Sequence, residues 1–467
     1  MKARRFLIAS LVIVSYLLVN AGLVMAGPIP PPKTVPTVST SKPAPTTTLP
    51  PSAQWSAVPG TNALNIGAAA LASDGTNIYM AGAASAYLKK PVYQWDGTSM
   101  TPLTGAFNNL IFTLKMGPDG CLYAGGSFTQ IDATPAKYIA KYSFADKKWS
   151  AVGPLDSSWQ VVNALKFPVL SLAFDADNYL YVAAGTTLGR GIFILSQNNS
   201  WDPILQGTFS TLFFDKIEGR NTMYAAGNKT GILQSATPSD PNSWTSVGNA
   251  AAVGNIKCIA TDKAGNVYVG GLLTGTIGLY KYDGTSWKQV GTFNTLYPIP
   301  PTVNALAYDS TNDIMYAGGS FKKSPSSPAI YYNCIAQRKV VPFGLGPAET
   351  WIAMGSGFNN TVFSLALDNN NILYAGGIFT KLGTASNSPQ AFYVAKWGIS
   401  STPPSSSSTS TSTTTSTDTS SSTDTSTSTT TITDTSSSTD TSTSTTTITD
   451  TSSSTDTSTS TTTTTSI

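Results

Sequence analysis

The sequence predicts an all-β fold, a seven-bladed β-propeller that is closed by an N-terminal strand and flanked by disordered segments. A strand centred on tyrosine and ending in small residues recurs seven times in the 467-residue chain, at intervals of 43 to 58 residues. This interval is that of one propeller blade. Each unit divides into four short strands without intervening helical periodicity. The last unit lacks its fourth strand, and an additional fourth strand precedes the first unit. The seven tyrosines are Tyr79, Tyr123, Tyr181, Tyr224, Tyr268, Tyr316 and Tyr374.

The four strands of a unit, called A to D, follow one another in a constant order. Strand A is an apolar alternation, as in 303–308, and an Asx-type turn such as 262–266 follows it. Strand B is the tyrosine strand, for example 122–126, and strand C is apolar with aromatics, as in 279–282. Strand D opens on tryptophan, except in the first unit, where Met100 takes that place. These tryptophans are Trp55, Trp149, Trp201, Trp244, Trp287 and Trp351.

The two ends of the repeat region predict how the ring closes. The seventh unit has strands A to C and then runs out after Trp397, without a strand D. The region begins with an additional strand D at Trp55–Val58, before any strand A. We expect this strand to complete the seventh blade, because a closed ring leaves no open sheet at either end.

The recurring glycines, tyrosines and tryptophans are interpreted as packing residues. Adjacent blades press face to face, and a glycine lets backbone approach where a Cβ atom would clash. Tyrosine and tryptophan fill the space between blades and carry a polar atom that needs a partner. Phe128, Phe321 and Phe379 recur at one position and should pack at the base of a loop. The paired glycines are Gly125 and Gly126, Gly270 and Gly271, Gly318 and Gly319, and Gly376 and Gly377.

Four regions follow from composition. Residues 1–26 have a basic start and an apolar run that fit a secretory signal, either cleaved or retained as an anchor. Residues 27–52 are a Pro/Thr-rich linker, and residues 53–399 are the propeller. Residues 400–467 consist almost entirely of Ser, Thr and Asp, which predicts a disordered tail, either an O-glycosylated stalk or an unmodified solubilising segment.

Composition also excludes several kinds of chemistry. The chain has no histidine, which removes the commonest general base and the commonest zinc ligand. Its three cysteines cannot all be paired within one chain, and buried free thiols are expected. The net charge of +3 predicts no nucleic-acid partner. Aspartate-rich turns at 175–178 and 309–313 could hold calcium or form ion-free Asx turns; we expect no metal and no cofactor.

The repeat resembles the kelch/galactose-oxidase type of propeller unit. The resemblance rests on Gly270-Gly271, the Tyr282-Asp283 pair and Trp287, and more loosely on Gly125-Gly126 with Trp149. It implies a blade architecture and a binding scaffold. The copper-oxidase members of that family use histidine ligands, so their activity is not implied here. Similar Tyr-Ala-Gly-Gly-x-Phe repeats are typical of secreted surface proteins.

Variable loops on a rigid scaffold are where binding usually occurs. In a propeller, the B–C and D–A loops share one face, and here these loops vary in length, whereas the A–B turns are short. We expect this face to bind a partner. A flat ring such as that of Trp159 could stack on a sugar or simply pack its own loop. The candidate contacts, which break the repeat pattern, are Trp159, Tyr297, Lys322, Lys323 and Lys381.

The sequence therefore predicts a secreted or surface-exposed, non-catalytic and monomeric binding module for a glycan or an extracellular protein. It is expected to have no membrane contact beyond the N-terminal signal. Two other hypotheses remain: a structural component of a surface coat, and a histidine-free enzyme that acts on glycans through a carboxylate pair.

Overall fold

The computed structural model of the protein describes residues 53–65, 67–82, 91–153, 165, 167–185, 190–228, 231–248, 254–272, 278–293, 301–322, 330–343 and 346–398. The signal, linker and tail segments lie outside these residues, and so do Trp159, Tyr297 and Lys323. The chain divides into two units after Pro403, and every described residue belongs to the first unit. Among the described residues, no helix is long and apolar enough to cross a membrane.

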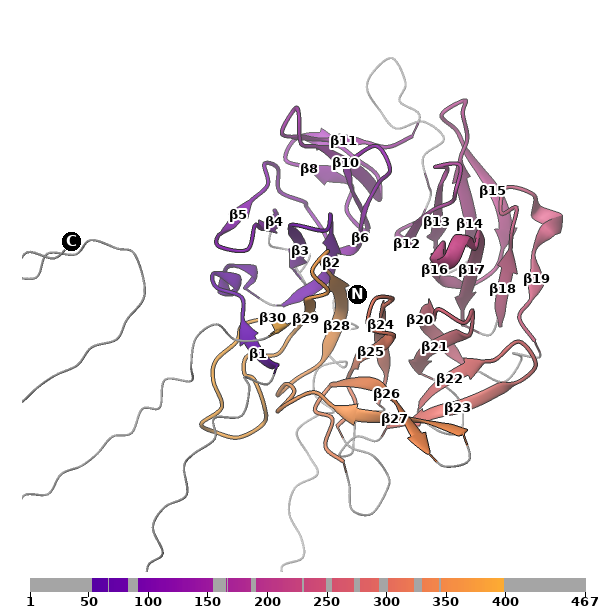
Figure 1. Ribbon diagram of the computed structural model, residues 1–467. Helices are drawn as coiled ribbons and strands as arrows, with labels where there is room; N and C mark the ends of the chain where they lie inside the picture. Colours follow the sequence, from indigo (N-terminus) through magenta and orange to yellow (C-terminus); the bar gives the residue numbers. More distant parts are fainter. Residues whose placement is uncertain are drawn as a thin grey trace, which may run out of the picture. The chain divides into compact units, whose positions relative to one another are not determined.

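Seven four-stranded antiparallel sheets form the blades (Figure 1). The innermost strands, in blades 1 to 7, are β2 (Ala68–Ser73), β6 (Ile111–Met116), β12 (Val169–Phe174), β16 (Phe209–Asp215), β20 (Asn255–Thr261), β24 (Val303–Asp309) and β28 (Val362–Leu367). The second strands are β3 (Ile78–Gly82), β7 (Leu122–Gly126), β13 (Leu180–Ala184), β17 (Thr222–Gly227), β21 (Val267–Leu272), β25 (Ile314–Gly319) and β29 (Leu373–Gly377).

The outer half of each blade follows the same order. The third strands are β4 (Val92–Trp95), β10 (Ile139–Ser143), β14 (Gly191–Leu195), β18 (Ile232–Ser235), β22 (Gly278–Tyr282), β26 (Ile335–Phe343) and β30 (Val394–Gly398). The outermost strands are β5 (Met100–Pro102), β11 (Lys148–Ala151), β15 (Trp201–Gln206), β19 (Thr245–Ser246), β23 (Trp287–Thr292), β27 (Gly346–Ala353) and β1 (Gln54–Ala57). Outside the blades lie the hairpin β8 (Gln130–Ile131) and β9 (Thr134–Pro135) and the short 3₁₀ helices η1 (Thr61–Leu64), η2 (Ile217–Gly219) and η3 (Pro241–Ser243).

The innermost strands make the ring. Each contacts the innermost strand of the next blade, from β2 through β28 and back to β2. Figure 1 shows these strands around the middle of the view, with the outermost strands at the rim. The seven-bladed propeller predicted from the repeats is thereby confirmed.

The ring closes through the N-terminal strand, as predicted. β1 pairs antiparallel with β30 and forms the outermost strand of blade 7, with Trp55 opposite Trp397. The Trp55 indole Nε1 donates a hydrogen bond to the carbonyl of Met354, in the preceding blade, at 2.9 Å. Blade 7 is therefore built from both ends of the repeat region and is tied to blade 6.

The repeated tyrosines hold the A–B turns of their own blades. The Tyr79 hydroxyl donates to Asp74 at 2.7 Å, and Tyr123 donates to Asp119 at 2.9 Å. The Tyr181 hydroxyl donates to Asp175 at 3.0 Å in the same way. The aspartate oxygens also accept backbone N–H groups of the turn, as Asp74 does from Thr76 and Asn77. In these three blades the polar partner expected for the tyrosine is thus an Asx-turn carboxylate.

The paired glycines have two separate neighbours. A Cβ atom on Gly125 would lie 2.5 Å from Val169 in the next blade, which is the blade-to-blade approach predicted from the sequence. A Cβ atom on Gly126 would lie 2.1 Å from the Leu110 carbonyl of its own blade. The second glycine therefore permits a close approach of backbone to backbone within the blade, which the sequence analysis did not distinguish.

The tryptophans of the outer strands pack against the preceding blade. The Trp287 Nε1 donates to the carbonyl of Val247 in blade 4 at 2.9 Å. In contrast, the Nε1 atoms of Trp149, Trp201 and Trp351 have no hydrogen-bond partner among the described residues. Packing, more than hydrogen bonding, accounts for the tryptophans at those three positions.

The three cysteines are all free. Cys258 and Cys334 are buried, as expected, whereas Cys121 is partly exposed. Burial raises the pKa of the Cys258 thiol to about 12.

Candidate recognition surface

The alternating strand directions give the propeller two distinct faces. The B–C and D–A loops emerge at one end of the sheets, here called the loop face, and the A–B and C–D turns emerge at the other, the turn face. Gln54, at the start of β1, lies opposite Gly398, at the end of β30. The chain therefore enters and leaves the described body at the turn face, and the loop face is free of both attachment points.

Two loops of the loop face are anchored by the same device. The Asn108 side-chain oxygen accepts hydrogen bonds from the backbone N–H groups of Thr129 and Gln130, at 2.8 and 3.1 Å. Its Nδ2 donates to Thr129 Oγ1 at 2.9 Å. In blade 7, Asn359 makes the corresponding three bonds to Thr380 and Lys381. Each asparagine ties a D–A loop to the following B–C loop.

Stacked phenylalanines support these loops from below. Phe358 and Phe379 stack with ring centroids 4.1 Å apart, and Phe293 and Phe321 stack at 4.3 Å. Phe128 packs edge-on against Phe107. Phe128, Phe321 and Phe379 are fully buried, which confirms the packing role predicted for them. The loop face therefore has a rigid base.

The two described lysines among the predicted contacts both brace loops. Lys322 Nζ donates to the carbonyl of Asn359 at 3.0 Å and so links the B–C loop of blade 6 to the loop entering blade 7. Lys381 Nζ donates to the carbonyl of Ser386 at 2.7 Å within its own loop. Their contact with a ligand stays a prediction, as does that of Trp159, Tyr297 and Lys323, which lie outside the described residues.

The exposed large hydrophobic side chains all lie on the loop face. Among the described residues they are Phe112, Leu272, Ile330 and Tyr331, with exposed fractions of 37%, 40%, 39% and 58%. Phe112 is near the start of an innermost strand, Leu272 ends a second strand, and the other two belong to the B–C loop of blade 6. All four positions are at the same end of the sheets. Because the exposed large apolar side chains of the described residues occur on this one face, it is the candidate interaction surface.

Charge is divided between the faces as well. Within the described ranges, Asp132 is the single acidic residue of the loop face, since the other acidic residues lie in or beside the A–B and C–D turns. The same ranges place five basic residues on the loop face: Lys137, Arg190, Lys257, Lys322 and Lys381. The loop face is therefore basic relative to the turn face, which favours anionic or acidic ligands.

Each innermost strand contains a β-bulge at its second or third residue. In blade 2, Ile111 pairs with Gly126 and Thr113 pairs with Gly125, which leaves Phe112 without a partner residue. The same shift occurs in all seven blades, always opposite the small-residue pair of the second strand. We call the seven unpaired residues the bulge ring: Ala69, Phe112, Leu170, Ser210, Lys257, Asn304 and Phe363.

The bulge ring lies at the loop-face end of the axis around which the innermost strands are arranged. Phe112 and Lys257 are exposed and the other members are partly exposed, whereas the residues just before them on the strands are buried. In blade 4, Ser210 Oγ donates to the carbonyl of Ile256 in blade 5 at 2.7 Å. Lys257 Nζ then donates to Asn304 Oδ1 at 3.3 Å, and Asn304 Nδ2 donates to the carbonyl of Val362 at 2.9 Å. These bonds run from blade to blade around the ring.

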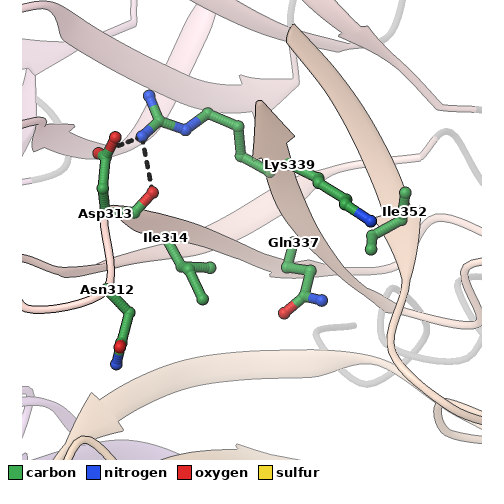
Figure 2. Close-up of a pocket in the computed structure, with 7 residues that line it drawn as sticks. Asn312, Asp313, Ile314, Gln337, Lys339 and Ile352 are labelled. Atoms are coloured by element: carbon green, nitrogen blue, oxygen red, sulfur yellow. Dashed lines mark hydrogen bonds and ion pairs between the residues drawn. The ribbon is translucent and has the colours of Figure 1, made fainter. Parts of the chain in front are cut away.

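The turn face carries a cavity of about 370 Å³ in blade 6 (Figure 2). Asp313 lies at one side of it, and Gln337, Lys339 and Ile352 lie along the outer strands. Arg338 also lines the cavity. The Arg338 guanidinium already donates to Asp313, to Asp262 at 3.1 Å and to the Tyr268 hydroxyl at 2.8 Å. Since this arginine is engaged with its own protein, it has little capacity left to hold an anionic ligand.

The aspartate-rich turns behave as Asx turns. Asp175 Oδ1 accepts the backbone N–H groups of Asp177 and Tyr179, at 3.0 and 2.9 Å. Asp309 Oδ1 does the same for Thr311 and Asn312. In the part of the chain that the structure describes, no three His, Cys, Asp or Glu side chains are grouped in a way that could hold a metal ion.

Comparison with known proteins places the chain in no established family. No protein-family model matches it, and no curated protein does so either. Among solved structures it is similar to the extracellular domains of two hybrid two-component systems from B. thetaiotaomicron. The first is 14% identical with a TM-score of 0.45 over 74% of this chain, and the second is 11% identical with a TM-score of 0.46 over 71%. The chain covers 40% of each of those chains, and likeness at this level supports no functional argument.

The strands of each blade could be predicted from the sequence, whereas the bulge ring was not anticipated. A partial signal for it was present, since the small-residue pair that ends strand B lies opposite the start of strand A. The pair is Gly-Gly in four blades, Ala-Gly in blades 1 and 4, and Ala183-Ala184 in blade 3, where the same bulge occurs. Small side chains at this pair are therefore compatible with the extra residue, and two glycines are not required for it.

Proposed function

We propose that the chain is a non-catalytic extracellular binding module that recognises its partner, a protein, with the loop face. The observation that carries this proposal is the position of Phe112, Leu272, Ile330 and Tyr331, the exposed large hydrophobic residues of the described chain, on that one face. Aliphatic side chains beside an aromatic one favour a protein surface, since apolar contacts supply most of the free energy of such associations.

Two further features support the same assignment. The chain enters and leaves the described body at the turn face, so a tether on either side leaves the loop face accessible. Buried phenylalanines and the Asn108 and Asn359 clamps hold the B–C loops of blades 2 and 7 in place. A rigid, preorganised surface loses less conformational entropy on binding. The extracellular location rests on the signal-like segment at residues 1–26.

The experiment is a binding array of extracellular proteins and glycans probed with the full chain. Hits would be measured again with Leu272→Ser/Tyr331→Ser on the loop face and with Glu218→Ser/Lys263→Ser, a matched exposed pair on the turn face. We expect a saturable protein ligand whose affinity falls at least about tenfold in the loop-face variant only.

Three results would contradict the proposal. A ligand lost only in the turn-face variant would move the recognition surface to the other side. A hit restricted to glycans would replace the protein partner. Self-assembly of folded chain without any ligand would instead favour a structural surface component.

A further inference from the structure

The bulge ring is divided into an apolar part and a polar part. Phe363, Ala69, Phe112 and Leu170 belong to the consecutive blades 7, 1, 2 and 3, whereas Ser210, Lys257 and Asn304 belong to blades 4, 5 and 6. The seven positions are structurally equivalent, because each is the unpaired residue opposite the small-residue pair. The arrangement therefore presents hydrocarbon on one side of the axis and hydrogen-bonding groups on the other.

The polar part contains one charge without a counter-charge. Lys257 is exposed, and its Nζ donates to the neutral side-chain oxygen of Asn304 at 3.3 Å. No ion pair to Lys257 occurs among the described residues. The other groups of this part have their donors engaged, Ser210 with the carbonyl of Ile256 and Asn304 with the carbonyl of Val362. The ammonium group is thus the part of the ring that is free to bind an anion.

The side chains of the apolar part of the bulge ring are accessible to a ligand. Phe112 is 37% exposed, and Leu170 and Phe363 are each partly exposed although they lie on innermost strands. Covering such side chains with a ligand's hydrocarbon would be favourable, because apolar surface of both the protein and the ligand would be removed from water. A ligand that used both parts would need an apolar body and an anionic group at one end.

We propose that the bulge ring is a binding site for a small amphiphilic carboxylate, with the apolar body against Phe112, Leu170 and Phe363 and the carboxylate at Lys257. This site lies around the axis within the loop face and shares Phe112 with the proposed protein-binding surface, but it takes a ligand of a different class. A carboxylate is chosen because a single ammonium donates well to it without the forked geometry that an arginine would supply. The ligand is non-covalent and undergoes no reaction.

The test uses three soluble probes on the full chain: 4-phenylbutyrate, its neutral analogue 4-phenyl-1-butanol, and butyrate. Binding is followed by calorimetry or by ligand-observed nuclear magnetic resonance. We expect phenylbutyrate to bind more tightly than the alcohol by about threefold or more, and butyrate to bind least. A single ammonium–carboxylate contact at an exposed site accounts for a preference of that size, and the phenyl ring accounts for the rest.

Two variants separate the parts of the site. Lys257→Met should remove the preference for phenylbutyrate over the alcohol while leaving the alcohol's affinity unchanged. Phe112→Ser should weaken both phenyl probes by about tenfold. Lys263→Met replaces an exposed lysine on the turn face and is the control. It should change neither the affinity of the phenyl probes nor the preference for phenylbutyrate. All three positions are exposed, so folding is checked by circular dichroism and is expected to be retained.

Three results would overturn the proposal: no binding of phenylbutyrate to folded protein at tens of millimolar, an unchanged carboxylate preference in Lys257→Met, or equal binding of butyrate and phenylbutyrate. None of these depends on the protein partner. A loop-face protein ligand found together with a blank here would leave the proposed function standing and remove this site alone.

Discussion

Arg338 Nη1 lies 3.1 Å from Asp262 Oδ2, and both side chains are 4% exposed. Arg338 is on β26 of blade 6 and Asp262 is in the A–B turn of blade 5, so a buried ion pair joins the two blades. The same nitrogen donates to the Tyr268 hydroxyl at 2.8 Å. One arginine therefore connects to the tyrosine–aspartate pair of blade 5, which blades 1, 2 and 3 also carry, and it does so from the neighbouring blade.

Replacing Arg338 by Met should lower the free energy of unfolding by about 3–5 kcal/mol, because the change leaves the Asp262 carboxylate buried without its cation. Chemical denaturation measures this directly. Lys263→Met is the control, since Lys263 pairs with Glu218 at 3.6 Å with both side chains mostly exposed, and it should cost less than about 1 kcal/mol. The double variant Arg338→Met/Asp262→Asn should recover part of the loss. A cost for Arg338→Met as small as that of the control would show that the pair does not fasten the blades.

Gly126→Ala should destabilise the protein by about 1–3 kcal/mol or more, because the new Cβ atom would lie 2.1 Å from the carbonyl of Leu110. Gly398→Ala is a matched control, since a Cβ atom there meets nothing within 4 Å. It should be neutral within about 0.5 kcal/mol or slightly stabilising, because alanine restricts the unfolded chain. Thermal and chemical unfolding measure the free energy of unfolding of both variants. Equal values for Gly126→Ala and Gly398→Ala would mean that the bulge in blade 2 does not require the second glycine.

Trp55→Ala should cost about 3–5 kcal/mol and make the N-terminal strand susceptible to proteolysis. The change removes the hydrogen bond from the indole to the carbonyl of Met354. It also removes the edge-to-face contact with Phe358, whose ring centroid lies 4.6 Å from that of Trp55. Tyr331→Ala, an aromatic truncation on the loop face where the side chain is 58% exposed, should change stability by less than about 0.5 kcal/mol. If both variants were equally stable, closure through β1 would contribute little to the fold.

The protein should lose stability at alkaline pH through its buried tyrosines. Burial, followed by the charge of the neighbouring aspartate, raises the pKa of Tyr316 and of Tyr374 to about 12. An unfolded tyrosine ionises near pH 10. Because the folded pKa is the higher one, the stabilisation is complete below about pH 10 and is lost as the pH rises through about 12.

Tyrosinate absorbance at 295 nm and the free energy of unfolding, both measured from pH 8 to pH 12, test this expectation. Tyr316→Phe should show a smaller loss of stability over the same range, since it removes one of the groups that ionise. An absorbance midpoint near pH 10 for all tyrosines of the folded protein would contradict it.

The repeat pattern was sufficient to predict the blades, their number and their closure. This is because each blade is formed by neighbouring segments of chain, so strand order and turn positions follow from local patterns such as 122–126 and 262–266. In a closed ring, the additional strand at Trp55 could pair only with the last blade, which lacked its outermost strand. The aspartate partners of Tyr79, Tyr123, Tyr181 and Tyr268 were not anticipated from the sequence.

The candidate site was predictable only in outline. The choice of the loop face depended on loop length, and the exposed residues Phe112, Leu272, Ile330 and Tyr331 support it. The individual contacts were harder to choose, because a residue that breaks the repeat pattern can do so for structural reasons. Lys322 and Lys381 are examples, since both donate to backbone carbonyls of the loops around them.

By itself, the amino-acid sequence determined the architecture of this protein: seven four-stranded units, a closing N-terminal strand and the residues that pack between blades. These depend on periodicity and on the volume of each side chain, which are local properties. Only the tertiary structure decided which residues meet across blades. The ion pair between Arg338 and Asp262, separated by 76 positions, and the bulge ring, whose members come from seven separate strands, exist because the ring brings distant segments to one axis.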